Sequence, residues 1–400
     1  MFDFDTIHDR LAWSATKWTK YRGRDVLPLW IADMDFPSPP AIRAALAAQV
    51  AHGNFGYAAP PPDLPALLAD DHLRRYDWRV DPKWIVWLPG LVLGLNLAVK
   101  ACCAAKERVI SFSPVYPPFL QAPLTQGCDL VNVPFKPLNA AGTELAIDFE
   151  CLEDALLPTS DDPPRPATRL LLLCHPHNPI GRLFSDDELD RLSEFCARHA
   201  LYVCSDEVHC DLILDGRTPH RPFAQRVAER SPALLARTIT LHGPGKTYNV
   251  AGLGIAWAII PDVDLRRRFR AAMQHLVPSP CSFGYSAARA AFTDCEAWRQ
   301  ALLARLRENR DRVDAALTRM RLAHTYPTVG YLVWIDAREL ASEVGDAASW
   351  FERHGVGLSD GAEFGSPDYL RLNFAAPPDL LREALSRMER ALASRSRLQA

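Results

Sequence analysis

Short apolar runs alternate with amphipathic stretches along most of the chain. The runs that predict strands lie at 84–88, 108–112, 130–133, 169–174, 201–205, 238–242 and 254–260. Most of them are apolar throughout, as expected for strands that are covered on both faces of a parallel sheet. Helical periodicity lies between them, most clearly at 90–103, 185–199 and 264–276. This alternation predicts an α/β fold, in which helices cover both faces of a mostly parallel, seven-stranded sheet.

The C-terminal third has a different pattern. Long helical stretches come first, and strand-like segments then flank one further helix; these elements lie at 286–293, 298–322, 330–335, 347–354 and 369–374. The pattern predicts a smaller α+β domain, and the prolines at 278 and 280 mark the boundary before it. We therefore expect an N-terminal arm over 1–40 that belongs to the small domain, a large domain over 41–280 and a small domain over 281–400.

The composition changes this picture little. Of the 400 residues, 48% are hydrophobic and 23% are charged, which is ordinary for a globular protein. A formal net charge of -3 does not favour nucleic acid or an anionic membrane surface as a partner. We find no apolar run that could span a membrane and no signal-peptide pattern in the acidic start. The ten cysteines match neither a zinc ribbon nor a disulfide framework, so we expect reduced cysteines in a cytoplasmic protein.

Polar residues just after the predicted strands are the candidate site, because ligands of such folds bind at the carboxyl ends of the strands. After the first strand, Gly90 begins a helix whose first amides could bind a phosphate. After the second strand, Tyr116 could stack on an aromatic ligand. A plain turn at Gly90 and a core position for Tyr116 are the structural alternatives.

Two further strand ends carry polar groups. A turn made rigid by prolines presents Asn178, and His175 and His177 lie beside it in the sequence. Two histidines suggest a metal, but no acidic third ligand lies nearby, so we expect no metal site. Asp206 directly follows a buried strand, and a carboxylate there needs a partner such as a protonated ring nitrogen. Helix capping is the alternative role of Asp206.

Lys246 stands out because it is the only lysine after Lys136, whereas arginine is abundant. It follows Gly243, Pro244 and Gly245 at the end of a predicted strand, which is an unusual place for a generic surface charge. Residues 243–247, with the sequence Gly-Pro-Gly-Lys-Thr, resemble part of a phosphate-binding P-loop. The full pattern fails, however, because position 240 is threonine where that loop requires glycine.

Together these residues resemble the class I and II aminotransferase-like enzymes of fold type I, which use pyridoxal 5′-phosphate (PLP). The sequence is most similar to one branch, the carbon–sulfur lyases of the MalY/PatB type, which are cystathionine β-lyase-like. The resemblance runs in order over residues 1 to about 390. The segments that carry it are 27–36, 55–57, 113–119, 176–179, 205–211, 246–249 and 371–375.

The resemblance implies a role for each residue after a strand. Lys246 would bind PLP covalently and would then act as the general base at the substrate α-carbon. Asp206 would keep the pyridine nitrogen protonated, which makes the ring an electron sink. The other implied cofactor contacts are the amides of Gly90, Leu91 and Val92 to the phosphate, Tyr116 stacked on the ring, and Asn178 and His209 near the ring oxygen.

The resemblance also implies contacts beyond the cofactor. Arg371 would bind the carboxylate of a small amino-acid substrate through two charge-assisted hydrogen bonds, and Ala32 would lie against that substrate. Tyr57 would reach the phosphate bound by a neighbouring subunit, which implies a homodimer. No nucleic-acid or membrane partner is implied.

Two features depart from the family pattern. The family usually has serine immediately before the lysine, but here that residue is Gly245, and position 243 is also glycine, so a hydroxyl that binds the phosphate is missing. We therefore predict weaker retention of PLP. The second departure is His175, where the branch usually has asparagine, and the sequence offers no explanation for it.

The resemblance favours a lyase over an aminotransferase. Many class I aminotransferases have an arginine where this chain has Gly254, and the lyase branch lacks that arginine too. We predict β-elimination from cystathionine or a related cysteine S-conjugate, which yields pyruvate, ammonia and a thiol. An aminotransferase is the alternative, because both reactions begin by removal of the same α-proton. A PLP-binding regulator is a remote alternative, since Lys246, Asp206 and Arg371 are all intact.

Overall fold

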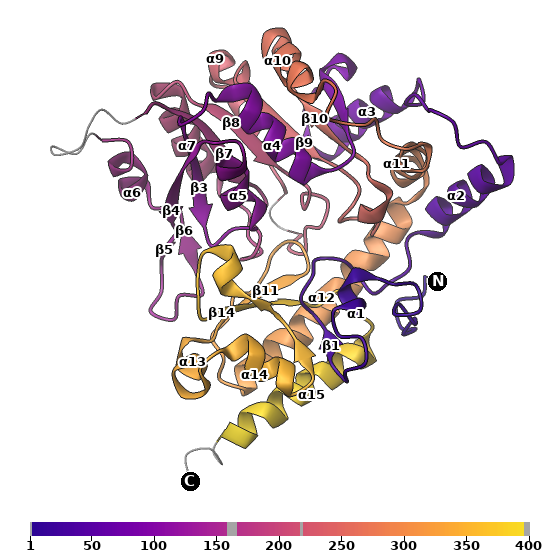
Figure 1. Ribbon diagram of the computed structural model, residues 1–400, viewed down its shortest axis with the longest axis vertical. Helices are drawn as coiled ribbons and strands as arrows, with labels where there is room; N and C mark the ends of the chain where they lie inside the picture. The colour runs from indigo at the N-terminus through magenta and orange to yellow at the C-terminus, as the bar shows by residue number, and fades with distance from the viewer. Residues whose placement is uncertain (1, 158–165, 217–218, 396–400) are drawn as a thin grey trace.

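The computed structural model describes residues 2–157, 166–216 and 219–395, and a seven-stranded sheet lies at its centre (Figure 1). The strand order is β2-β10-β9-β8-β7-β3-β4. The strands are β2 (Ile85–Leu88), β3 (Arg108–Ser113), β4 (Asp129–Pro134), β7 (Thr168–Cys174), β8 (Tyr202–Asp206), β9 (Thr238–His242) and β10 (Ala256–Ile259). Each begins and ends within two residues of its predicted run. The α/β class with a mostly parallel, seven-stranded sheet is thus confirmed.

Strand β10 is the exception to the parallel order. It runs antiparallel to both β2 and β9, whereas β4, β3, β7, β8 and β9 are mutually parallel. The start of β10 therefore lies at the edge where the parallel strands end. An apolar run carries no information about strand direction, so this reversal was not predicted.

Side chains of the parallel strands alternate between two cores, one on each face of the sheet. Val109, Leu172 and Ile239 share a core with α4 (Leu91–Cys102), α5 (Pro118–Thr125) and α10 (Val263–Met273). Ile110 and Leu173 belong to the opposite core, with α6 (Phe149–Asp154), α7 (Asp186–Arg198), α8 (Phe223–Ala228) and α9 (Pro232–Leu235). Burial on both faces explains why the strand sequences are apolar without interruption.

The C-terminal elements form a second layer, which lies below the central sheet in Figure 1. Its antiparallel sheet has the order β11-β14-β13, with β11 (Leu332–Asp336), β13 (Ser359–Asp360) and β14 (Tyr369–Asn373). Its helices are α12 (Glu296–Arg319), α13 (Arg338–Val344), α14 (Ala347–Arg353) and α15 (Pro378–Arg395). Near the chain start, β1 (Leu27–Pro28) pairs in parallel with β12 (Val356–Gly357). The domain boundaries at 40 and 280 stay predictions.

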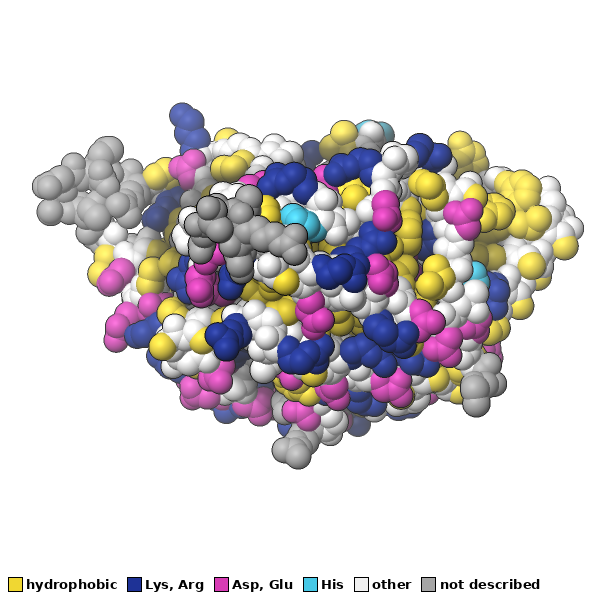
Figure 2. All heavy atoms as spheres, turned by 90° about the horizontal axis from the view of Figure 1, so that it is seen from below, with side chains coloured by type: hydrophobic (Ala, Val, Ile, Leu, Met, Phe, Trp, Pro, Cys, Tyr) yellow, Lys and Arg dark blue, Asp and Glu magenta, His cyan; other side chains and the backbone are white. Residues whose placement is uncertain are grey.

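Several elements were not predicted from the sequence. They include α1 (Thr16–Thr19), α2 (Pro40–His52), α3 (Leu64–Tyr76), α15 and the short strands β5 (Lys136–Pro137) and β6 (Leu145–Ala146), and α11 (Ser282–Asp294) is longer than expected. Helix α2 is rich in alanine and buries only Ile42, so it has no clear apolar stripe. On the face seen in Figure 2, acidic and basic side chains are interspersed. No helix in the described part of the chain is both long and apolar enough to cross a membrane.

Leu172 tests the two-sided core. It is 1% exposed on β7, so Leu172→Ala should lower the free energy of unfolding by about 2–5 kcal/mol. Leu138→Ala is the control, because Leu138 is 63% exposed and its loss should cost less than about 0.5 kcal/mol. Urea denaturation followed by tryptophan fluorescence measures both. Equal losses in the two variants would contradict the assigned core.

Candidate active site

A cavity of about 220 Å³ lies at the edge where the parallel strands end. It collects residues from the N-terminal segment, from the start of α4 and from the turns after β3, β7, β8 and β9. The predicted site residues that line it are Ala32, Gly90, Leu91, Val92, Tyr116, Asn178, Asp206, His209 and Lys246. Other lining residues, which were not predicted, include Phe119, Cys174, Ala251, Ile255 and Ala256.

The register of the sheet explains why these turns meet. Cys174 pairs with Asp206, and Asp206 pairs with Leu241, so β7, β8 and β9 end at the same level. The turns that carry Asn178 and Lys246 therefore begin side by side with the turn after Asp206. Because β10 is antiparallel, its first residues close the same edge from the other side.

Lys246 lies in the turn after β9, and its side chain reaches the N-terminal segment. Its Nζ donates a hydrogen bond of 2.7 Å to the carbonyl oxygen of Ala32. Burial, reinforced by the positive charge of Arg371, lowers the pKa of Lys246 to about 8. A substantial fraction of this amine is therefore neutral, and nucleophilic, near physiological pH.

Asp206 is a buried carboxylate at the end of β8. One of its oxygens accepts a hydrogen bond from the backbone amide of Val208 at 3.2 Å. Burial raises the pKa of Asp206 to about 7. A cationic group placed in the cavity would restore the charge that burial disfavours, because an opposite charge stabilises the ionised carboxylate.

The first turn of α4 forms one wall of the cavity. Gly90 is the residue before this helix, and Gly90, Leu91 and Val92 all line the cavity. The first amides of a helix have no acceptor within the helix, and the helix dipole favours negative charge at this end. This wall suits a phosphate group.

Arg371 lies on β14, directly beside the cavity. Its Nη1 donates to Asn178 Oδ1 at 3.1 Å, and its Nη2 donates to the carbonyl oxygen of Trp30 at 2.8 Å and to Ser359 Oγ at 3.2 Å. These bonds all go to neutral groups, and Nε is buried without a partner in the described part of the chain. Burial lowers the pKa of Arg371 to about 10. A ligand carboxylate is the complement that such a guanidinium needs.

His209 lines the cavity as a neutral imidazole. Burial, together with the charges of Lys246 and Arg371, lowers the pKa of His209 to about 3. Its ring meets Tyr331 edge-on at 5.9 Å, and the Tyr331 hydroxyl donates to the carbonyl oxygen of Ala32 at 3.2 Å. The sequence analysis missed Tyr331, which stands in an apolar stretch without any neighbouring polar signal.

Tyr57 is the one predicted site residue that lies apart from the cavity. Its side chain is fully exposed in the single chain. Nearby, Phe55 is also exposed and stacks on Phe283 at 5.7 Å. A contact between Tyr57 and a neighbouring subunit stays a prediction.

The two histidines considered as metal ligands occupy structural positions. His177 lies between two carbonyl oxygens, that of Cys174 at 3.0 Å from Nδ1 and that of Pro114 at 2.7 Å from Nε2, and its neutral ring donates to one of them. His175 makes a hydrogen bond of 2.9 Å with the carbonyl oxygen of Arg221. Burial lowers the pKa of His175 to about 3, so it is a neutral core residue, and this explains how a histidine is accommodated there.

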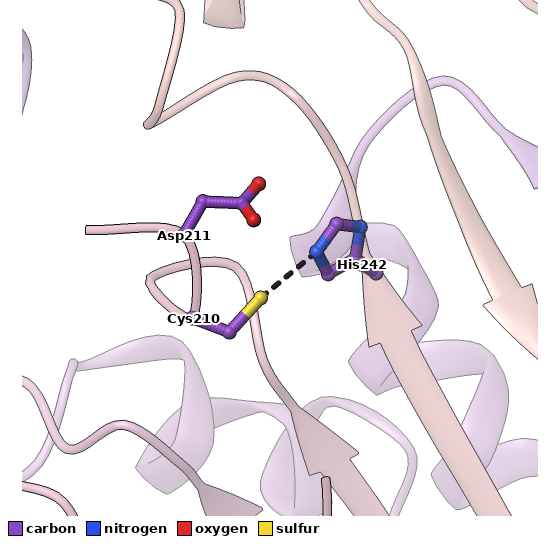
Figure 3. A group of neighbouring side chains, drawn as sticks. All are labelled: Cys210, Asp211 and His242. Carbon is purple, nitrogen blue, oxygen red and sulfur yellow. Dashed lines mark hydrogen bonds between the residues drawn. The ribbon is translucent and has the colours of Figure 1, made fainter. Parts of the chain in front are cut away.

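A polar cluster beside the end of β9 was not predicted. Figure 3 shows Cys210, Asp211 and His242 facing one another, with Cys210 Sγ and His242 Nε2 2.9 Å apart. Arg75 forms an ion pair with Asp211 at 2.9 Å, and the Tyr76 hydroxyl donates to the same carboxylate. Burial would raise the pKa of Asp211, but the Arg75 guanidinium overrides burial and holds the pKa below its usual range. These groups have the chemistry of metal ligands. Because Arg75 already neutralises the carboxylate, we interpret the cluster as a hydrogen-bond network that joins the turn after β8 to β9.

Comparisons with known proteins agree with this site. Residues 24–388 match the family model for aminotransferase class I and II. The chain is 33% identical to cystathionine beta-lyase PatB of Bacillus subtilis (strain 168), over 98% of this chain and 100% of that protein. Named aminotransferases match more distantly.

Solved structures have the same fold. The crystal structure of OvoB is 39% identical, with a TM-score of 0.91, and the match covers 98% of this chain and 100% of that one. Cystalysin from Treponema denticola, whose crystal structure contains PLP, is 28% identical, with a TM-score of 0.90 over 98% of this chain and 99% of that one. From the family model and these likenesses, the chain belongs to the class I and II aminotransferase family of PLP-dependent enzymes.

Proposed function

We propose that this chain is a carbon–sulfur β-lyase that cleaves L-cystathionine or a related cysteine S-conjugate to pyruvate, ammonia and a thiol. The observation that carries the proposal is a pair of buried basic groups, with Lys246 lining the cavity and Arg371 bonded to Asn178 beside it. Arg371 offers a guanidinium for the α-carboxylate of an amino acid, and Lys246 offers an amine of lowered pKa. Relatives named cystathionine beta-lyase support the choice of substrate class.

The donor set around the cavity fits PLP. Asp206 is a buried carboxylate without a cationic hydrogen-bond partner in the described chain, and a protonated pyridine nitrogen would supply one. The amides that begin at Gly90 suit the phosphate, and Tyr116 and Asn178 line the space between these groups. Lys246 provides the amine for the covalent bond. His209, as a neutral imidazole, would contribute a hydrogen bond near the ring.

The chain's own residues would carry out the remaining chemistry. PLP, when bound, delocalises the negative charge that develops at the substrate α-carbon. Arg371 binds the substrate carboxylate, and the Lys246 amine takes the α-proton. The Cβ–S bond then breaks, and its electron pair leaves with the sulfur as a thiolate. The released 2-aminoacrylate hydrolyses to pyruvate and ammonia.

A lyase is favoured over an aminotransferase by two observations. Gly254 occupies the position where many class I aminotransferases have an arginine, and its φ of +59° suits glycine. The named aminotransferases are also the more distant relatives. The alternative, an aminotransferase, would leave the Cβ–S bond intact and would pass the substrate amino group to a keto acid.

A homodimer is part of the proposal. The exposed apolar side chains of Val50, Phe55 and Tyr57 lie on α2 and the segment that follows it, where a second subunit would cover them. We propose that Tyr57 reaches the phosphate site of that subunit. A cytoplasmic location agrees with the ten unpaired cysteines.

Product analysis tests the lyase directly. Purified, PLP-loaded protein incubated with L-cystathionine and no keto acid should release pyruvate, ammonia and free thiol in equal amounts, because β-elimination needs no amino acceptor. Lys246→Ala is the control and should release none. Amino-group transfer that appears only after a keto acid is added, without pyruvate, would instead identify an aminotransferase.

The pKa of Lys246 predicts how the cofactor-free protein captures PLP. Only the neutral amine reacts, so the rate of covalent capture should rise with pH through about 8, well below the usual lysine value of 10.5. Borohydride reduction followed by mass spectrometry of the modified peptide measures the rate. In Asp206→Asn the pH transition should persist with a somewhat lower midpoint, because the Asp206 charge raises the pKa of Lys246. Loss of the transition would assign it to Asp206 instead. A midpoint near 10.5 would contradict the lowering of the Lys246 pKa by burial.

Gly245→Ser tests the missing hydroxyl. A Cβ at Gly245 would meet Ala251 Cα at 3.4 Å, which is ordinary contact, so serine fits. A hydrogen bond to the phosphate contributes about 1.5–3 kcal/mol, so PLP should bind roughly ten- to hundredfold more tightly. Fluorescence titration of the cofactor-free protein measures the affinity. Gly243→Ser is the control. Its Cβ would lie 3.2 Å from the carbonyl oxygen of Ile255, which is a tight contact, so serine fits less well there and we expect no gain in PLP affinity. Unchanged PLP affinity in Gly245→Ser would refute the prediction that the absent hydroxyl weakens PLP binding.

A further inference from the structure

The segment of residues 30–36, called the arm segment here, is held by an unusual number of side chains. Its residue Ala32 lines the cavity. The carbonyl oxygens of residues 30–34 and 36 each accept at least one hydrogen bond from a side chain outside the segment. Most of these donors come from distant parts of the chain, so the conformation of the arm segment depends on the second layer and on the turn after β9.

Two of the donors are the cations of the proposed site. Lys246 binds the carbonyl oxygen of Ala32 at 2.7 Å, and Arg371 binds that of Trp30 at 2.8 Å. A carbonyl oxygen attracts a positive charge, so the position of each carbonyl helps to fix the direction in which its cation points. The arm segment thus contacts both groups on which the reaction depends.

Two asparagines connect the same segment to the elements that carry these cations. Asn249 lies in the turn of Lys246, and its Nδ2 donates to the carbonyl oxygens of Met34 at 3.1 Å and Phe36 at 2.8 Å. Its Oδ1 also accepts from the amide of Met34 at 3.2 Å. It has a φ of +54°, a conformation that asparagine tolerates better than most residues.

Asn373 lies on β14, the strand of Arg371, and is completely buried. Its Nδ2 donates to the carbonyl oxygens of Ile31 at 2.7 Å and Asp33 at 2.6 Å. These bonds lie on either side of Ala32, the residue whose carbonyl holds Lys246. Loss of Asn373 would therefore release the part of the arm segment nearest to both cations.

A buried ion pair fixes the outer side of the arm segment. Lys17 is completely buried, and its Nζ lies 2.6 Å from Asp35 Oδ2. Arg10 binds both Asp33 and Asp35, each at 2.7 Å. Because a buried charge without its partner is costly, the arm segment is strongly held from this side as well. Asn249 and Asn373 complete the attachment on the side of the cavity.

We infer that Asn249 and Asn373 are positioning residues, which align Lys246 and Arg371 through the carbonyls of the arm segment. The inference rests on the roles of those two cations in the proposed function. The side-chain amides of both asparagines are already occupied by backbone groups, so neither is free to act on the substrate or the cofactor directly. If these asparagines were purely structural, their loss would lower the stability of the protein alone. If they are positioning residues, their loss also changes the chemistry of Lys246.

Asn373→Ala is the first test, and Asn309→Ala is its matched control. Asn309 is equally buried and also binds two carbonyl oxygens, those of Phe374 at 2.9 Å and Ala376 at 2.8 Å, without touching the arm segment. In Asn373→Ala, kcat/KM should fall by about ten- to hundredfold, because small misplacements of reacting groups are costly. In Asn309→Ala, kcat/KM should stay within about threefold at a similar loss of stability.

A second readout needs no turnover. The charged groups that face Lys246 are Arg371, Asp33 and Asp206, and the carbonyl of Ala32 adds an acceptor that stabilises the ammonium form. When that acceptor moves away, the pH midpoint for covalent capture of PLP by cofactor-free Asn373→Ala should fall below that of the unaltered protein. In Asn309→Ala the midpoint should not move.

Limited proteolysis of the holoenzyme detects release of the arm segment itself. Trypsin should cut after Lys17 faster in Asn373→Ala, because Lys17 is buried only while the arm segment is held, whereas cleavage after the exposed Lys20 should change little.

If Asn373→Ala does not fold, Asn249→Gly removes the other contact without backbone strain and should give the same results. An unchanged midpoint together with unchanged cleavage after Lys17 would overturn the inference, even if the lyase reaction is confirmed. Both changes in a protein without lyase activity would support it and refute only the proposed reaction.

Discussion

The common level at which β7, β8 and β9 end is the constraint on which the site depends. Parallel pairing of Cys174 with Asp206, and of Asp206 with Leu241, brings three turns to one edge of the sheet. A shift of one residue in either pairing would turn the Asp206 side chain to the opposite face. The two apolar cores that cover the sheet therefore do more than stabilise the fold, because they fix the register that places the carboxylate and the amine at one cavity.

The cavity contains charges that a protein interior normally avoids. Burial lowers the pKa values of Lys246 and Arg371 and raises the pKa of Asp206, so burial destabilises the charged form of each group. Groups perturbed in this way are typical of functional sites, since a ligand of complementary charge relieves the cost of burial. The neutral His209 adds no further positive charge beside the two cations.

The sequence predicted those parts of the molecule that depend on local pattern. Strands buried on both faces are apolar runs, and the residues after them, such as Asp206 and Lys246, are found by position. The antiparallel direction of β10 and the alanine-rich α2 left no comparable signal. Contacts between distant segments could not be predicted from the sequence either. The sequence marks Asn373 only as part of a family motif, and its contact with the N-terminal segment depends on the folded chain.

The contacts between Trp30 and Arg371 span 341 positions of sequence, and those between Ile31 and Asn373 span 342. This separation has a consequence during translation, when the N-terminal part of a chain leaves the ribosome first and begins to fold first. The N-terminal segment emerges early, but Arg371 and Asn373, which bind the carbonyl oxygens of Trp30, Ile31 and Asp33, are made much later. The nascent chain must therefore keep this segment unassembled until β14 has emerged. A premature stop in the message before β14 would then leave the arm segment without these partners, although the arm segment itself is synthesised intact.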